Sequence, residues 1–107
     1  MVETLYRETN EGYTIVVNKL AEESFDVLFL PHHAHHAIEI ENVHSKRHAI
    51  EGAKNFPTFY AIAIEHGFSL TTQYFKHRDG REVHTSFAMD LDCTKERFTN
   101  LLLGNVV

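Results

Sequence analysis

The chain has 107 residues and a formal net charge of −5 with neutral histidines, from 10 Lys and Arg against 15 Asp and Glu. This length suits one domain, residues 1–107, with a single core, and a hydrophobic fraction of 43% is typical of a folded globule. An acidic surface repels phosphate backbones, which disfavours nucleic acid as a ligand.

Membrane and disulfide chemistry are also disfavoured. No apolar run approaches the ~18 residues that a membrane-spanning helix needs, and the first residues lack the basic and apolar regions of a secretory signal. The single cysteine, Cys93, excludes an internal disulfide and a paired-cysteine zinc motif. We therefore expect a reduced, cytoplasmic protein.

Two strands are predicted early in the chain. Residues 12–19 (GYTIVVNK) are dense in β-branched residues after a glycine, which favours a strand. Residues 25–30 place every second apolar side chain on one face. Pro31 closes this second strand, because proline cannot donate to a central ladder.

A third strand is predicted over about 35–43, and it divides the histidine-rich segment. If Ile38 and Ile40 point to the core, His36 shares their side by the period of two. The solvent side would then carry His35, Ala37, Glu39 and Glu41.

A helical stretch follows the third strand. Ser45 is a good N-cap, and Gly67 suits the position just after the helix C-terminus. Pro57 either kinks one long helix or begins a second one. Apolar residues at helical spacing should lie on the sheet, namely Ala49, Ala53, Phe56 and Tyr60.

A hairpin is predicted next. Residues 69–77 and 82–90 flank Asp79-Gly80, a dipeptide that favours a two-residue type I′ turn. The register of such a turn would bury Leu70, Tyr74, Val83, Phe87 and Met89. The solvent-exposed face of the hairpin would carry Thr71, Gln73, Phe75, His77, Glu82, His84 and Ser86.

A last helix is predicted over about 94–103, capped by Asp92 and ended by Gly104, with Phe98, Leu101 and Leu102 facing inward. The predicted fold is therefore α+β, with an antiparallel or mixed five-stranded sheet, the order β-β-β-α-β-β-α and helices packed on one face.

The histidine cluster suggests a metal site. Six of the nine histidines lie between residues 32 and 48, and imidazole is a common ligand of Zn²⁺ and Ni²⁺. His33 and His35 have the spacing that puts two ligands on one face of a strand. Further candidate ligands are His32, His36, Glu39 and His44. A polar edge with incidental chelation and a pH-sensitive interface are the alternatives.

His84 offers a catalytic alternative. The string Val83-His84-Thr85-Ser86-Phe87 resembles half of the two-histidine phosphoesterase signature, in which paired strands supply a histidine and a hydroxyl to the phosphate. His77 and Glu82 are expected across the ladder from His84, where they would also form an ordinary polar surface.

Residues 12–56 carry a family resemblance. A Gly-Tyr-Thr-Ile strand opening a three-strand meander, followed by the helical segment from Ser45 to Lys54, is similar to the β-β-β-α pattern of HicB-type antitoxins. The histidine run replaces the proline- and glycine-containing segment usual before the helix in that family. The resemblance implies a small accessory protein that acts by binding another protein.

The leading hypothesis is a small acidic, non-enzymatic, protein-binding module that acts through a protein partner or its own homodimer. Leu28, Leu30 and Phe75 are the expected exposed interface residues. A two-fold dimer through a sheet edge is also expected, because any open sheet has two edges. A cofactor is not expected, unless Zn or Ni binds the histidine cluster.

Overall fold

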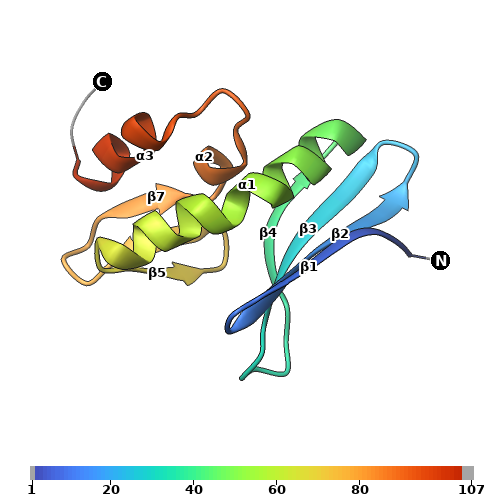
Figure 1. The fold of residues 1–107 in the computed structure, drawn as a ribbon, viewed down its shortest axis with the longest axis horizontal. Coiled ribbons are helices and arrows are strands. Elements are labelled where there is room, and N and C mark those ends of the chain that lie inside the picture. Colours follow the sequence, from blue (N-terminus) through green and yellow to red (C-terminus); the bar gives the residue numbers. More distant parts are fainter. Residues whose placement is uncertain (1, 105–107) are drawn as a thin grey trace.

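The computed structural model describes residues 2–104, which form two separate antiparallel sheets and three helices (Figure 1). The elements in chain order are β1 (Glu3–Asn10), β2 (Tyr13–Ala21), β3 (Ser24–Pro31), β4 (Ile38–Val43), α1 (Lys46–Glu65), β5 (Phe68–Thr71), β6 (Tyr74–His77), β7 (Glu82–His84), α2 (Ser86–Met89) and α3 (Lys95–Leu102). The sheets have the orders β1-β2-β3-β4 and β5-β6-β7. The α+β class is confirmed, but the predicted single five-stranded sheet is wrong.

The first reason is β1, which the sequence analysis missed. Its sequence, ETLYRETN, is mostly polar and lacks a run of β-branched residues. An edge strand needs only one apolar face and one paired side, so charged residues are tolerated on it. Leu5 and Tyr6 supply that face by packing against the core.

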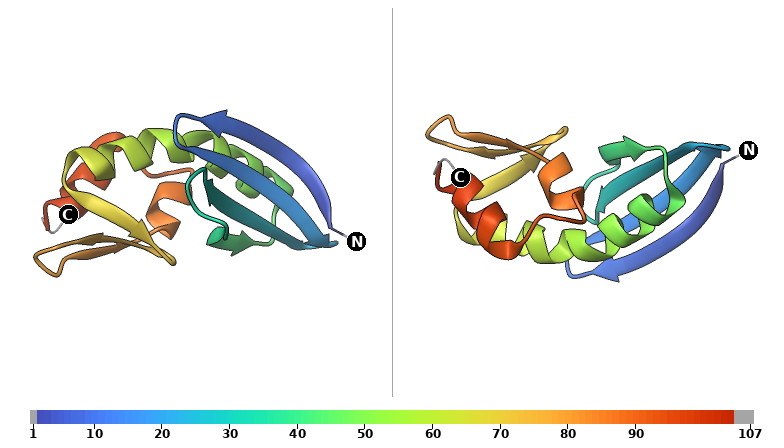
Figure 2. Two further views of the ribbon diagram at one scale, coloured as in Figure 1. Left: turned by 90° about the horizontal axis from the view of Figure 1, so that it is seen from below. Right: turned by 90° about the horizontal axis from the view of Figure 1, so that it is seen from above.

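The second reason is the length and position of α1. Ser45 caps the helix as predicted, with its Oγ accepting the N–H of His48 at 3.2 Å. Pro57 lies inside one continuous helix, and Gly67 follows its end at a φ of +85°. Twenty residues make a helix about 30 Å long, so α1 spans both sheets (Figure 2). Its N-terminal half lies beside the four-stranded sheet and its C-terminal half beside the three-stranded sheet.

The predicted strand 69–77 is broken by a turn. Gln73 adopts a φ of +65°, in the left-handed region, and the chain reverses there to pair β5 with β6. Thr71 Oγ1 donates to the carbonyl oxygen of Tyr74 across this turn at 3.2 Å. The segment therefore forms its own sheet instead of extending the first one.

The predicted hairpin register is also wrong by one residue. The loop contains three residues, with Gly80 at a φ of +101° and the His77 N–H donating to the Arg81 carbonyl at 2.9 Å. Such a loop ends in a left-handed residue, and it shifts the pairing relative to a two-residue turn. Phe75 consequently pairs with Val83, and Tyr74 pairs with His84.

This shift exchanges the two faces of β6, whereas Val83 of β7 is buried as predicted. Phe75 is fully buried, whereas Tyr74, which was expected in the core, is 39% exposed. A one-residue slip moves every side chain to the opposite face. The expectation that Phe75 is an exposed interface residue is therefore wrong.

The C-terminal part forms α2 and α3. The single turn α2 was not foreseen. Helix α3 matches the expected last helix, with Phe98 and Leu102 fully buried and Leu101 half-buried. Its N-cap is Thr94 in place of the expected Asp92, since Thr94 Oγ1 accepts the N–H of Arg97 at 3.1 Å.

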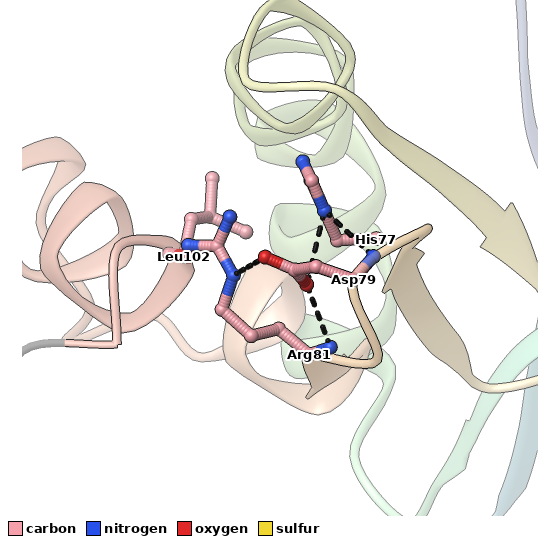
Figure 3. A network of polar contacts seen from close by, with 4 residues as sticks. All are labelled: His77, Asp79, Arg81 and Leu102. Carbon is pink, nitrogen blue, oxygen red and sulfur yellow. Dashed lines mark hydrogen bonds and ion pairs between the residues drawn. The ribbon is translucent and has the colours of Figure 1, made fainter.

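The β6–β7 loop clamps the end of α3 (Figure 3). Arg81 Nη1 donates to the Leu102 carbonyl at 2.7 Å, and Arg81 Nε donates to Asp79 Oδ2 at 2.8 Å. The Arg81 guanidinium carbon also lies 5.4 Å from the centre of the Phe68 ring. The cation thus satisfies a carbonyl at the helix C-terminus, where positive charge is favoured.

Phe56 joins the two sheets in one core. Its ring, with no exposed surface, lies between Phe29 of β3 and Phe75 of β6, at centroid distances of 6.3 and 6.0 Å. Phe75 in turn lies 5.8 Å from Phe98 of α3. Aromatic pairs at such distances contribute beyond their buried area. Phe56 is therefore the contact through which α1 holds both sheets.

We expect Phe56→Ala to lower the free energy of unfolding by about 3–5 kcal/mol, because it removes a fully buried ring and leaves a cavity between the sheets. Chemical denaturation monitored by circular dichroism measures the loss. Lys54→Ala, at an exposed position of the same helix, is the control and should change stability by less than about 0.5 kcal/mol. A loss of similar size in both variants would contradict the role of Phe56.

Candidate functional site

The outer face of the four-stranded sheet, opposite α1, is the candidate functional site. On β2 and β3 the core side carries Ile15, Val17, Val27 and Phe29. Strand alternation sends the intervening side chains to the other face. Helix α1 packs on the core side, because its Ala53 and Phe56 belong to the same buried cluster. Figure 2 shows no helix of residues 2–104 against the other face of this sheet.

The middle of the outer face is one row of four side chains, named here the charged row. Strand pairing places side by side Arg7, Val16, Leu28 and Glu39. The ends of the row carry opposite charges, and its two central residues are apolar. Val16 is 3% exposed among its neighbours, and Leu28 is half-buried.

Two further rows flank the charged row. One consists of Thr9, Thr14 and Leu30. The other is polar and consists of Thr4, Asn18, Asp26 and Asn42. Side-chain hydrogen bonds run along the polar row, from Thr4 Oγ1 to Asn18 Oδ1 at 2.9 Å and from Asn42 Nδ2 to Asp26 Oδ1 at 2.6 Å.

Charge is unbalanced across the outer face. Partial burial, then the charge of Asp26 and a hydrogen bond with it, raise the pKa of Glu39. The two carboxyl groups therefore share an acidic corner. At the opposite side of the sheet Arg7 is exposed, and within residues 2–104 it forms no ion pair. The face thus carries an unpaired cation and a surplus of carboxyl groups.

Two of the three predicted interface residues lie on this face. Leu28 and Leu30 are neighbours there and half-buried, whereas Phe75 belongs to the core of the other sheet. The period-two pattern of residues 25–30 was sufficient to place both leucines away from the core.

The histidine segment forms the loop between β3 and β4. The His32 N–H donates to the Gly12 carbonyl at 2.9 Å, and His32 Nε2 lies 3.0 Å from Thr14 Oγ1. His33, His35 and His36 are exposed. Across residues 2–104, no group of three or more His, Cys, Asp or Glu side chains is arranged to hold a metal ion. Metal binding by His33 and His35 stays a prediction.

The two candidate catalytic histidines lie at opposite ends of the β6–β7 hairpin. His84 Nδ1 accepts the N–H of Ser86 at 3.1 Å, and His77 Nδ1 accepts that of Asp79 at 3.1 Å. Because the first faces α2 and the second caps the hairpin loop, the fold does not bring their rings to one phosphate-sized site. Catalysis by His84 or His77 also stays a prediction.

A cleft of about 430 Å³ lies between β4, the start of α1 and α2. Its lining residues are Glu41, His48, Ser86, Phe87, Asp90, Leu91 and Asp92. Sequence alternation had placed Glu41 on the solvent side of β4. The register shifts beside Leu28 of β3, so Ile40 is an extra residue and Glu41 turns to the core side.

Glu41 is the polar group of this cleft whose hydrogen bonding is incomplete. Its Oε2 is buried and has no hydrogen-bond partner within residues 2–104. Burial raises the pKa of Glu41, and the neighbouring His48 and His84 partly oppose this. His48 Nε2 itself donates to the Met89 carbonyl at 2.9 Å. No local sequence signal marks the bulge that produces this arrangement.

Comparison with known proteins gives no relative from which a role could be inferred. No protein-family model matches the chain, and no curated protein or solved structure matches it. The resemblance of residues 12–56 to HicB-type antitoxins therefore rests on the local strand and helix pattern. Within residues 2–104, no helix is both long and apolar enough to cross a bilayer.

We expect Glu41→Gln to change how stability depends on pH. Because folding raises the pKa of Glu41, the folded protein holds that proton more tightly than the unfolded chain. Wild-type stability therefore falls as pH rises through the unfolded-state pKa toward the folded-state pKa. The variant should lose this decline and gain up to about 1 kcal/mol at neutral pH.

Denaturation of both proteins across acidic to neutral pH measures this difference. Glu51→Gln, at an exposed position of α1, is the matched control and should follow the wild-type profile. An unchanged pH slope in Glu41→Gln would show that burial of this carboxylate costs nothing.

Proposed function

We propose that the protein is a non-enzymatic protein-binding module that self-associates through the outer face of its four-stranded sheet. The observation that carries this proposal is the position of Leu28 and Leu30, which are adjacent apolar residues on a sheet face without a covering helix. Burying apolar surface is the main driving force of protein association.

The size of the outer face supports a weak dimer. Strands spaced by about 4.8 Å, with a rise of about 3.3 Å per residue, give four strands of about eight residues a face of roughly 500 Å². Two such faces together bury about 1,000 Å², the lower end of the range for specific interfaces. Association in the micromolar range or weaker is therefore expected.

The face is better suited to association than the sheet edges. A register shift between Thr4 and Tyr6 interrupts β1, and charged side chains flank it. The other edge strand, β4, carries the bulge beside Glu41. Bulges and charges on edge strands oppose pairing with another chain.

A second copy of this chain is the occupant that the charges favour. The outer face carries both an unpaired cation and surplus carboxyl groups, so an identical face offers complementary charge. We also propose a cytoplasmic setting, because a chain with one cysteine needs no oxidising compartment for an internal disulfide.

We expect Leu28→Asp to make the protein monomeric at concentrations at which the wild type forms dimers. The new carboxylate would be desolvated without a partner at the centre of the interface. Sedimentation equilibrium over a wide concentration range measures the association constant.

Leu103→Asp is the matched control, because Leu103 is 50% exposed at the end of α3 and distant in the fold from the outer face. It should dimerise like the wild type. A wild type that stays monomeric at millimolar concentration, or a Leu28→Asp variant that dimerises equally well, would contradict the proposal.

A further inference from the structure

We propose that Arg7 and Glu39 fix the geometry of this dimer, by pairing across a two-fold axis that runs parallel to the strands between β2 and β3. Arg7 of each copy then faces Glu39 of the partner subunit. This inference rests on the proposed function and adds the residues that determine its specificity.

Two stacked copies of one face are related by a two-fold axis lying in the plane between them. In the aligned class of sheet packing, strand directions stay within about 30° of each other, and the axis then runs either along the strands or across them. An axis along the strands reverses the order of the charged row in the second copy, whereas an axis across the strands keeps that order. The charges at the ends of the row therefore discriminate between them.

An axis along the strands reverses the charged row. It places Arg7 opposite Glu39 of the partner subunit and Val16 opposite Leu28 of the partner subunit, twice by symmetry. In the polar row, it places Asn18 opposite Asp26 of the partner subunit, where the amide can donate to the carboxylate. Each row therefore faces side chains of complementary charge, polarity or hydrogen-bonding capacity.

An axis across the strands keeps the order of the row. When such an axis passes over the charged row, Arg7 faces Arg7 of the partner subunit, and Glu39 faces Glu39 of the partner subunit. Like charges brought together at an interface oppose association. The charged row therefore favours the first arrangement over one whose axis runs across the strands above that row.

The acidic corner provides a second, independent reason for a cation from outside the chain. Strand pairing places Glu39 diagonally across from Asp26 on the outer face, and within residues 2–104 no Lys or Arg forms an ion pair with either. Arg7 of the partner subunit would supply that cation. A guanidinium group suits this position, because its several donors can bind two carboxyl groups together.

Charge exchange tests the pairing. We expect Arg7→Glu alone and Glu39→Arg alone each to weaken dimerisation by about tenfold or more, because each creates two like-charge contacts per dimer. The double variant, Arg7→Glu with Glu39→Arg, should restore wild-type affinity to within about threefold, because it re-forms both pairs with reversed polarity. Sedimentation equilibrium measures all four proteins.

The controls separate folding, pairing and self-association. Denaturation curves should show that the single variants fold as stably as the wild type, since Arg7 is exposed and Glu39 lies at a sheet edge. If the single variants dimerise normally while Leu28→Asp does not, the dimer forms through the outer face in another geometry, and the proposed pairing of Arg7 with Glu39 is overturned. If the double variant stays as weak as the singles, the pairing is also overturned. If the wild type itself does not dimerise, the proposed function fails together with the pairing.

Discussion

The packing of Phe56 between Phe29 and Phe75 is the contact on which the rest of the structure depends. Helix α1 has 20 residues and extends past the end of either sheet. It can pack on both sheets only because its buried residues contact each of them. Phe56 lies where the two sheets meet, and the small buried residues that precede it in α1, Ala49, Gly52 and Ala53, let the chain approach closely. At Gly52, an added Cβ would lie 2.5 Å from Met89 Cε and 3.2 Å from the Met89 carbonyl oxygen, so the Met89 side chain would have to move and the carbonyl would be crowded.

The same arrangement leaves one side of the four-stranded sheet without a covering layer. Because a single helix serves two sheets, the core side of each sheet is filled while the outer face of β1–β4 receives no helix. The sequence has adapted to this by mixing apolar residues with charges on that face. A mixed face of this kind stays hydrated in the monomer and still gains apolar contact when a complementary surface covers it.

Local patterns predicted most of the individual elements but not how they assemble. The N-cap at Ser45, the strands on either side of residues 21–24 and the buried Phe98 of α3 follow from cap chemistry and periodicity. The second sheet could not be predicted, because it depends on the chain reversal at a left-handed Gln73. The hairpin register was missed because a short sequence motif does not distinguish the three-residue loop at Gly80 from a type I′ turn. Alternation was sufficient to place Leu28 and Leu30 on the face opposite the core, while their role in an interface stays a prediction. Arg7, which stands at the opposite end of the charged row from Glu39, was missed together with β1.

The most direct test of the account is an isotope-filtered nuclear magnetic resonance experiment on a mixed sample of labelled and unlabelled protein. It detects only contacts between different copies. The account predicts contacts between the Val16 methyl groups of one copy and the Leu28 methyl groups of the other, at concentrations at which the dimer forms. Contacts between copies that involve other surfaces, with none between Val16 and Leu28, would contradict it.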